Sequence, residues 1–120
     1  MNCIFCKIIS GDIPSYTIYE DDIVKCFLDV NPENPGHSLI IPKKHYQDIK
    51  DIDNNTLYHI SDVSKKMYDL LKEKLNFDGL RYVQNNGNIQ EVKHYHLHLI
   101  PFYNEKPNMT VEEVYNLLKK

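Results

Sequence analysis

The sequence predicts an α+β domain in which an antiparallel sheet carries helices on one of its faces. Segments of strand-like composition stand both before and after a long segment with helical periodicity, and no linker or internal repeat divides them. A length of 120 residues with 42% hydrophobic content also fits one globular domain with one core. We expect this domain to span residues 1–120.

The predicted strands are short runs rich in β-branched and aromatic residues, and turn-forming residues bound them. Residues 17–30 are expected to form a β-hairpin that turns at Asp21-Asp22. The Pro/Asn/Gly turn of residues 31–37 leads into a third strand over residues 37–42. The two remaining strands follow the long helix, at residues 79–85 and 94–101, with the polar connection 86–93 between them.

The predicted long helix covers residues 55–75, where apolar residues recur every three or four positions. This apolar stripe is expected to pack on one face of the sheet. Near the end of the chain, Thr110 and Glu113 form the pattern of a capping box, which predicts a short final helix. The stripe of the long helix consists of Leu57, Ile60, Val63, Met67, Leu70, Leu71 and Leu75.

The composition argues against several classes of protein. The formal net charge is -3, and the sequence has no cluster of Lys and Arg that would bind the phosphate backbone of a nucleic acid. No apolar run approaches the roughly 20 residues that span a bilayer, and the first residues lack the apolar core of a signal peptide. We therefore expect a cytoplasmic protein without a membrane anchor. Three cysteines, an odd number, argue against a disulfide scaffold.

Three histidines, His94, His96 and His98, occupy alternate positions of the predicted fifth strand. Because alternate residues of a strand share a face, these imidazoles point one way while Tyr95 and Leu97 point the other. Neighbouring imidazoles at low dielectric oppose one another's protonation, so three in register indicate a functional use. Two uses are open from the residues alone: metal ligation, as in a water-activating metal hydrolase, and nucleophilic or acid–base chemistry.

The spacing Cys3-x-x-Cys6 is that of half a zinc-binding site, and it also occurs in redox-active cysteine pairs. A redox pair normally opens a helix that follows a strand, and no strand is predicted before Cys3. The zinc interpretation is therefore favoured, and it requires two further ligands. Cys26 lies among apolar residues and is expected to be buried packing.

Three stretches of the sequence resemble the histidine triad (HIT) superfamily: HYHLHLI over residues 94–100, CIFCKIISGDIPS near the start, and PGHSLIIPKKHY in the middle. Over nearly its whole length the chain is similar to the Hint-like branch, in particular to its bacterial-type, zinc-containing members. The resemblance implies a HIT-like fold with a five-stranded antiparallel sheet, one long helix and short helices at the termini. It also implies a homodimer in which the sheets of two subunits join and the long helices pack together.

The resemblance further implies a nucleotide hydrolase or transferase that acts at the α-phosphate of purine nucleoside phosphoramidates of the AMP or GMP type. His96 would attack the α-phosphorus as a neutral imidazole and form a nucleotidyl-histidine that water cleaves. His98 and His37 match histidines near the phosphate, and Asn85 matches an asparagine that reaches it. Gln90 matches a glutamine that could donate to the developing oxyanion.

The nucleoside and metal sites are implied in the same way. Asp29 matches the carboxylate that accepts hydrogen bonds from both ribose hydroxyls. His45 and His94 match two histidines that complete a structural Cys₂His₂ zinc site with Cys3 and Cys6, and no catalytic metal is implied. The apolar walls around the purine base are matched by Phe5, Ile8, Phe27 and Val30.

Two features depart from the usual Hint pattern. The connection of residues 86–92 is roughly two residues shorter than usual, which predicts a phosphate loop of different shape. Glu91 stands where the family's phosphoramidases often carry a serine, and its carboxylate would either repel anionic leaving groups or act as a proton donor. A dinucleoside polyphosphate hydrolase, or a non-catalytic module that binds purine nucleotides or protein partners, therefore stays open as an alternative.

Overall fold

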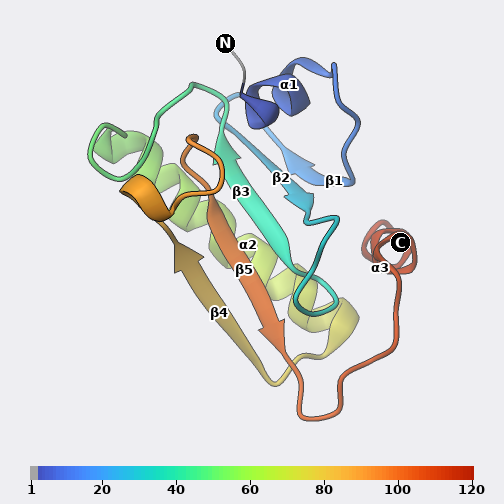
Figure 1. The fold of residues 1–120 in the computed structure, drawn as a ribbon. Helices are drawn as coiled ribbons and strands as arrows, with labels where there is room; N and C mark the ends of the chain where they lie inside the picture. Colours follow the sequence, from blue (N-terminus) through green and yellow to red (C-terminus); the bar gives the residue numbers. More distant parts are fainter. Residues whose placement is uncertain (1–2) are drawn as a thin grey trace.

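The computed structural model describes residues 3–120, in which an antiparallel sheet of five strands has the order β1-β2-β3-β5-β4 (Figure 1). Every pairing in this sheet is antiparallel. The predicted α+β fold with a five-stranded antiparallel sheet is thereby confirmed. The strands are β1 (Thr17–Glu20), β2 (Val24–Leu28), β3 (Ser38–Pro42), β4 (Gly79–Gln84) and β5 (Leu97–Phe102).

Helix α2 (Asn54–Leu75) crosses one face of the sheet and lies behind it in Figure 1. Its buried residues follow the predicted apolar stripe and share one hydrophobic core with β2, β3 and β5. Its first residue precedes the predicted 55–75 by one position. The predicted capping box is also present, because Thr110 and Glu113 exchange hydrogen bonds at the start of the last helix. The remaining helices are α1 (Ile4–Ser10), the 3₁₀ turn η1 (Gly87–Ile89) and α3 (Val111–Leu118).

Alternate residues of β2 and β3 belong to two hydrophobic clusters. Cys26 and Ile40, which pair across the two strands, pack in the core with α2. Phe27 and Leu39, the next pair, pack with residues of α1 on the opposite face. This explains why every residue of β3 is buried. Within residues 3–120, the corresponding face of β4 and β5 carries no helix, and it lies open toward the viewer in Figure 1.

The fifth strand begins later than the predicted residue 94. Its ladder with β3 starts at Leu97, opposite Ile40. The cause lies at Pro42, the last residue of β3, which has no N–H to donate and whose carbonyl accepts from Nε2 of His94 at 2.8 Å. The predicted alternation of side chains persists outside the ladder. Tyr95 is buried in the core with α2, whereas the rings of His94 and His96 pack against Phe5 of α1.

The predicted Pro/Asn/Gly turn fixes the start of β3 beside the end of β5. Gly36 has a φ of +90°, and a Cβ at this position would lie 2.6 Å from Cδ1 of Leu75, so only glycine fits. The side-chain amide of Asn34 donates to the carbonyl of Pro101 at 2.8 Å. These contacts set the position of His37, the residue that follows Gly36.

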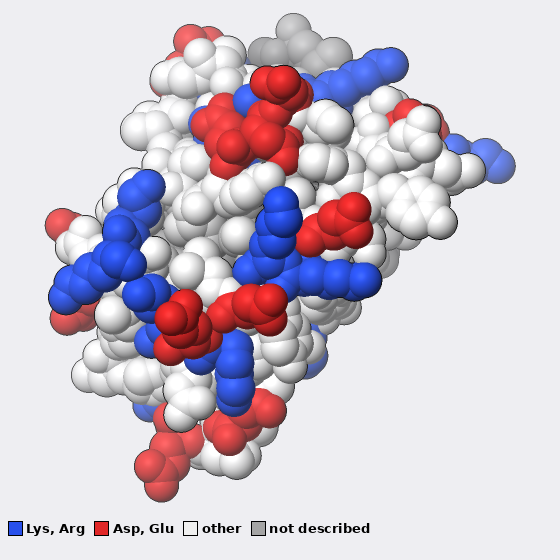
Figure 2. Space-filling view, turned by 180° about the vertical axis from the view of Figure 1, so that it is seen from behind, with Lys and Arg blue, Asp and Glu red and all other residues white. Residues whose placement is uncertain are grey.

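The face of the molecule that carries α2 has a mixed charge (Figure 2). Lys and Arg side chains are interspersed there with Asp and Glu, and no patch of a single sign covers this face. Among residues 3–120, none of the helices combines the length and the apolar content needed to cross a membrane.

The carboxylate of Asp21 joins the turn between β1 and β2 to helix α2. Its Oδ1 accepts from the N–H groups of Ile23 and Val24, both at 2.8 Å. Its Oδ2 accepts from Nε2 of His59 at 2.6 Å and from the hydroxyl of Tyr19 at 2.9 Å. Burial alone would raise the pKa of Asp21, but these hydrogen bonds outweigh burial and lower it. The ionised carboxylate is therefore the form that stabilises the fold.

We expect Asp21→Ala to lower the free energy of unfolding by about 2–3 kcal/mol at neutral pH, because it removes hydrogen bonds to a charged acceptor. Because folding lowers the pKa of Asp21, its ionised carboxylate contributes its full stabilisation above the ordinary pKa of 3.8. This contribution decreases as the pH falls below that value. The difference from wild type should therefore shrink in acid, as measured by urea unfolding at several pH values. Asp22→Ala, at the exposed next position, is the matched control. Equal losses in the two variants would contradict this role of Asp21.

Candidate active site

A cleft of about 570 Å³ opens on the face of β4 and β5 that α2 does not cover. Alternate residues of these two strands line it, together with α1, the turn before β3 and the connection before β5. The fold thus brings together side chains that are far apart in the sequence. The predicted site residues that line the cleft are Phe5, Asp29, His37, Asn85, His96 and His98.

The apolar lining of the cleft differs from the prediction. Phe5 lines it, but Ile8 and Phe27 do not; they are buried and pack with Phe5 between α1 and the sheet. The ring centroids of Phe5 and Phe27 are 5.7 Å apart, edge to face. Val30 is 64% exposed and is not a lining residue. Ile4, which precedes Phe5 in α1, supplies apolar surface that the sequence did not predict.

Gln90, predicted to donate to an oxyanion, is not among the lining residues of the cleft. It is 5% exposed, and its Nε2 donates to the carbonyl of Gln47 at 2.7 Å. Its Oε1 is buried and has no hydrogen-bond partner within residues 3–120. Asn85 and His98 line the cleft and carry side-chain N–H groups that could serve as donors in its place.

Arg81 lines the cleft and was not predicted as a site residue. It stands opposite Ile100 in the β4–β5 ladder, and Val83 stands opposite His98. Counting back from Asn85 by twos along β4 would have found Arg81, because alternate residues of a strand share a face. Glu33 and Asn31 were also missed. They belong to the turn before β3, where no regular spacing of residues indicates which way a side chain points.

The hydrogen bond that His96 makes determines which of its nitrogens can react. Its Nδ1 lies 2.7 Å from the carbonyl oxygen of His94. Because a carbonyl only accepts, the hydrogen resides on Nδ1 and the lone pair on Nε2. Burial lowers the pKa of His96, and this outweighs the opposing effects of the His94 carbonyl and of the Asp29 and Glu91 carboxylates. His96 is therefore neutral at neutral pH, with Nε2 available to a ligand.

His37 and His98 form a second chain of hydrogen bonds. The N–H of Glu33 donates to Nδ1 of His37 at 3.1 Å, so the hydrogen of this ring lies on Nε2. That nitrogen is 2.9 Å from Nδ1 of His98 and donates to it. Burial and the neighbouring imidazoles lower the pKa of His98 to about 4. Neutral His98 therefore carries its hydrogen on Nε2, where it can donate to an oxygen of a bound anion.

A second cluster, made of Cys3, Cys6, His45 and His94, places two sulfur and two nitrogen atoms within 4.8 Å of one another. Nδ1 of His94 lies 3.4 Å and 3.6 Å from the two sulfurs. Nδ1 of His45 lies 3.3 Å from Sγ of Cys6 and 3.1 Å from Nδ1 of His94. A tetrahedral ion at the usual zinc bond lengths holds such atoms about 3.3–3.8 Å apart. The donor set and its spacing fit a Cys₂His₂ zinc site.

The orientation of His94 agrees with a metal ligand. Its Nε2–H donates to the carbonyl of Pro42, so a lone pair on Nδ1 faces the two cysteines. Burial lowers the pKa of His94 to about 4, which keeps the ring neutral. An imidazole whose N–H is fixed on a backbone carbonyl is typical of histidines that ligate zinc.

Asp29, His37 and His98 also lie close enough together to hold an ion. Their hydrogen bonds do not favour this use. Nδ1 of His37 already accepts from the N–H of Glu33, and a metal on Nε2 would require the ring to lose its only hydrogen. Oδ2 of Asp29 lies 3.6 Å from that Nε2. These three residues fit a hydrogen-bonding chain better than the ligand set of a metal hydrolase.

Comparison with known proteins identifies the family. A family model described as the HIT domain matches residues 10–105 of this chain. This chain belongs to the HIT family. The predicted resemblance to the HIT superfamily is thereby confirmed, and the matched residues include His94, His96 and His98.

Similar proteins extend the comparison. An uncharacterized HIT-like protein of Methanocaldococcus jannaschii is 44% identical in an alignment 128 positions long, which covers 98% of each chain. An adenosine 5'-monophosphoramidase of Saccharomyces cerevisiae is 41% identical over 111 residues, which cover 91% of this chain and 68% of the yeast protein. The crystal structure of a zinc-bound histidine triad family protein from Mycobacterium smegmatis is 35% identical, with a TM-score of 0.91 and coverage of 99% of this chain and 91% of that one.

Proposed function

We propose that this HIT protein is a nucleotide hydrolase that acts at the α-phosphate of purine nucleoside phosphoramidates through a nucleotidyl-His96 intermediate. The observation that carries the proposal is the lone pair on Nε2 of His96, which the hydrogen bond from Nδ1–H to the His94 carbonyl keeps on the cleft side. The yeast relative named an adenosine 5'-monophosphoramidase supports this choice of substrate class.

The substrate is expected to bind with its nucleoside toward α1 and its phosphate over β5. Phe5 and Ile4 offer apolar surface to the base. Asp29, which follows β2 and lines the same cleft, offers two carboxylate oxygens to the ribose hydroxyls. His98 and Asn85 then lie where their N–H groups can donate to the phosphoryl oxygens.

The proposed reaction has two displacements at phosphorus. In the first, the lone pair of His96 Nε2 forms a bond to the α-phosphorus while the bond from phosphorus to the leaving nitrogen breaks, and the departing amine takes a proton from solvent. In the second, water attacks the phosphorus, the bond to Nε2 breaks, and a proton from this water goes to solvent. The products are the amine, the nucleoside monophosphate and neutral His96.

Rapid quench with an AMP phosphoramidate, followed by intact-mass spectrometry, tests this proposal. We expect one adenylyl group per chain, located on His96. Faster turnover of a diadenosine polyphosphate than of any phosphoramidate would instead support the polyphosphate hydrolase. A protein that binds AMP and turns over neither compound would support the non-catalytic binding module.

We further propose that Cys3, Cys6, His45 and His94 hold a structural zinc ion. The spacing of their donor atoms and the zinc-bound relative from Mycobacterium smegmatis support this. Zinc bound there would join the start of α1 to the segment that carries the triad. We also propose a cytoplasmic location, because the chain has three cysteines, and an odd number argues against the disulfide scaffold of a secreted protein.

We also propose that the protein is a homodimer built on the edge strand β4. Among the described residues 3–120 this strand pairs only with β5, and Figure 1 shows no element beyond it. Exposed edge strands readily pair with a second chain. Tyr82 on β4 and Tyr68 on α2 are 47% and 43% exposed and would be covered by a second copy related by a two-fold axis.

The dimer is expected to sediment at twice the 14.2 kDa mass of one chain. Tyr82→Glu should convert it to monomers, because the two-fold axis would bring two buried carboxylates close together. Analytical ultracentrifugation over a range of protein concentrations measures both. A wild-type protein that stays at the mass of one chain at high concentration would exclude the dimer.

A further inference from the structure

Glu91 places an unpaired negative charge in the wall of the cleft. Its side chain is exposed and lines the cleft beside the triad. Within residues 3–120 it makes no ion pair and no side-chain hydrogen bond. Lys93, the nearest cation along the chain, is engaged elsewhere, since its Nζ donates to the carbonyl of Gly87 at 2.7 Å. The Glu91 carboxylate is therefore available to a ligand.

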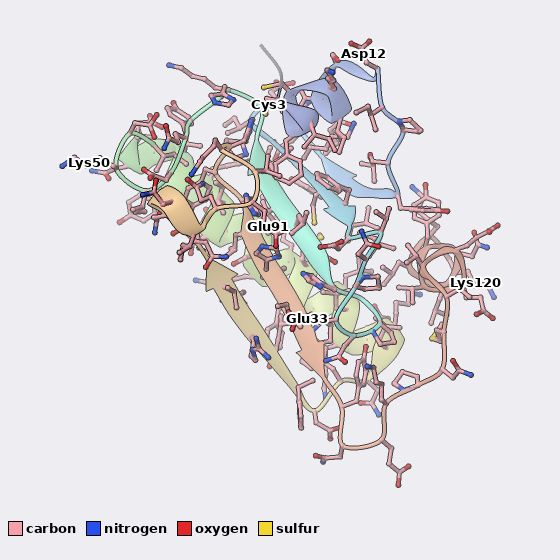
Figure 3. All side chains as sticks on the ribbon, in the orientation of Figure 1. Cys3, Asp12, Glu33, Lys50, Glu91 and Lys120 are labelled. Carbon is pink, nitrogen blue, oxygen red and sulfur yellow. The ribbon has the colours of Figure 1, made fainter. Side chains whose placement is uncertain are left out.

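This charge faces the space in which a substrate would react. Glu91 and His96 line the same cleft, so a ligand bound at His96 lies within electrostatic reach of the Glu91 carboxylate. Figure 3 shows the labelled Glu91 and Glu33 one above the other along β5, on the open face of the sheet. Asp29 is the third carboxylate that lines the cleft. Of these three, Asp29 has the proposed role of binding the ribose.

One cation also lines the cleft, but it stands away from the proposed nucleophile. Arg81 is opposite Ile100 in the β4–β5 ladder. Two residues away along each strand, Val83 is opposite His98. Alternate residues of a strand are about 6.6 Å apart, so Arg81 lies past His98 in the direction away from His96. Accordingly, the positive charge of Arg81 helps to lower the pKa of His37, which also lines the cleft. The surroundings of His96 are therefore anionic.

We propose that Glu91 makes the cleft selective for phosphoramidates whose leaving amine carries a second positive charge, as in the phosphoramidate of a diamine or of a basic side chain. This inference rests on the proposed transfer of the nucleotide to His96. The distal ammonium pairs with Glu91 while the phosphorus–nitrogen bond breaks and the departing nitrogen takes a proton from solvent. A polyphosphate leaving group meets repulsion at the same place. Of the two roles open for Glu91 from the sequence, the structure thus favours electrostatic selection.

Three AMP phosphoramidates with the same carbon chain test the inference: those of putrescine, n-butylamine and γ-aminobutyrate, which end in an ammonium, a methyl and a carboxylate. We expect kcat/KM to rise about fivefold from the methyl to the ammonium compound and to fall about fivefold to the carboxylate, as for one partly exposed ion pair. In about 1 M salt, where the Debye length is about 3 Å, the differences in kcat/KM among the three compounds should become smaller.

Two variants and one control assign the effect to Glu91. Glu91→Gln should bring the three kcat/KM values together, and Glu91→Lys should reverse their order. Glu105→Gln removes an exposed carboxylate that does not line this cleft and should keep the wild-type order. An order that survives in Glu91→Gln, or the absence of any order in wild type, would overturn the inference.

A binding measurement separates this inference from the proposed function. Calorimetric titration of the His96→Ala protein with the three compounds gives their order of affinity without turnover. If wild type adenylylates His96 from all three compounds at equal rates and affinities, the selectivity fails and the proposed function stands. If no adenylyl-histidine forms but the ammonium compound binds most tightly, and this preference is lost in His96→Ala/Glu91→Gln, the proposed function fails and the charge selectivity stands.

Discussion

The His96→Ala protein is expected to fold, bind zinc and lose its turnover of AMP phosphoramidates by about 10⁴-fold or more, as when the nucleophile of a covalent enzyme is removed. The physical reason is the loss of a ring that has no equivalent within residues 3–120, because it combines a lone pair in the cleft with an N–H fixed on a backbone carbonyl. Its neighbour His98 has its N–H on the cleft side and its lone pair engaged by His37, so it cannot replace His96 as the nucleophile.

Initial rates and intact-mass spectrometry after rapid quench measure this loss. The adenylylated species should be absent from His96→Ala. His59→Ala is the matched control, because His59 lies on α2 and pairs with Asp21 on the other side of the sheet. This control should keep its turnover. In His96→Gly, added imidazole should restore part of the rate by occupying the vacated position. Turnover of His96→Ala at the wild-type rate would show that another group attacks phosphorus.

Removal of zinc is expected to destabilise the fold by on the order of 5 kcal/mol or more, since metal-binding free energy at a site that the unfolded chain lacks is folding free energy. The four residues of the cluster come from α1, from the segment after β3 and from the segment before β5. The effect should extend to catalysis. In the proposed zinc site His94 supplies a ligand atom, and its carbonyl accepts from Nδ1–H of His96. Movement of His94 would therefore remove the hydrogen bond that fixes the tautomer of His96.

Elemental analysis should find one zinc per chain, and Cys3→Ser or Cys6→Ser should reduce the zinc content and the thermal midpoint together. Cys26→Ala is the control: this cysteine is fully buried in the core with α2 but lies outside the cluster, so the variant should keep its zinc. It should lose about 1 kcal/mol for the cavity that it leaves. An unchanged thermal midpoint after complete zinc removal would contradict a structural role for the ion.

Local patterns predicted most of the fold. The spacing of apolar residues in α2 and the alternation in β2 and β3 hold because each element buries one defined face, and the period of that face is set by backbone geometry. The same reasoning placed His94, His96 and His98 on one side of the chain. It failed for the start of β5, where Pro42 removes a hydrogen-bond donor from the neighbouring strand. That neighbour is 52 residues away in sequence, beyond the reach of a local pattern.

The sequence by itself determined which residues are candidates for chemistry here: the alternating histidines, the cysteine pair and the carboxylate of Glu91. Only the tertiary structure decided how these side chains are arranged. The tautomers of His96 and His98 depend on the carbonyl of His94 and, through His37, on the N–H of Glu33. Likewise, the packing of α1 on β2 buried Ile8 and Phe27, and the pairing of β4 with β5 brought Arg81 to the cleft. A proton goes to whichever nitrogen finds an acceptor, and that acceptor exists only once distant segments meet.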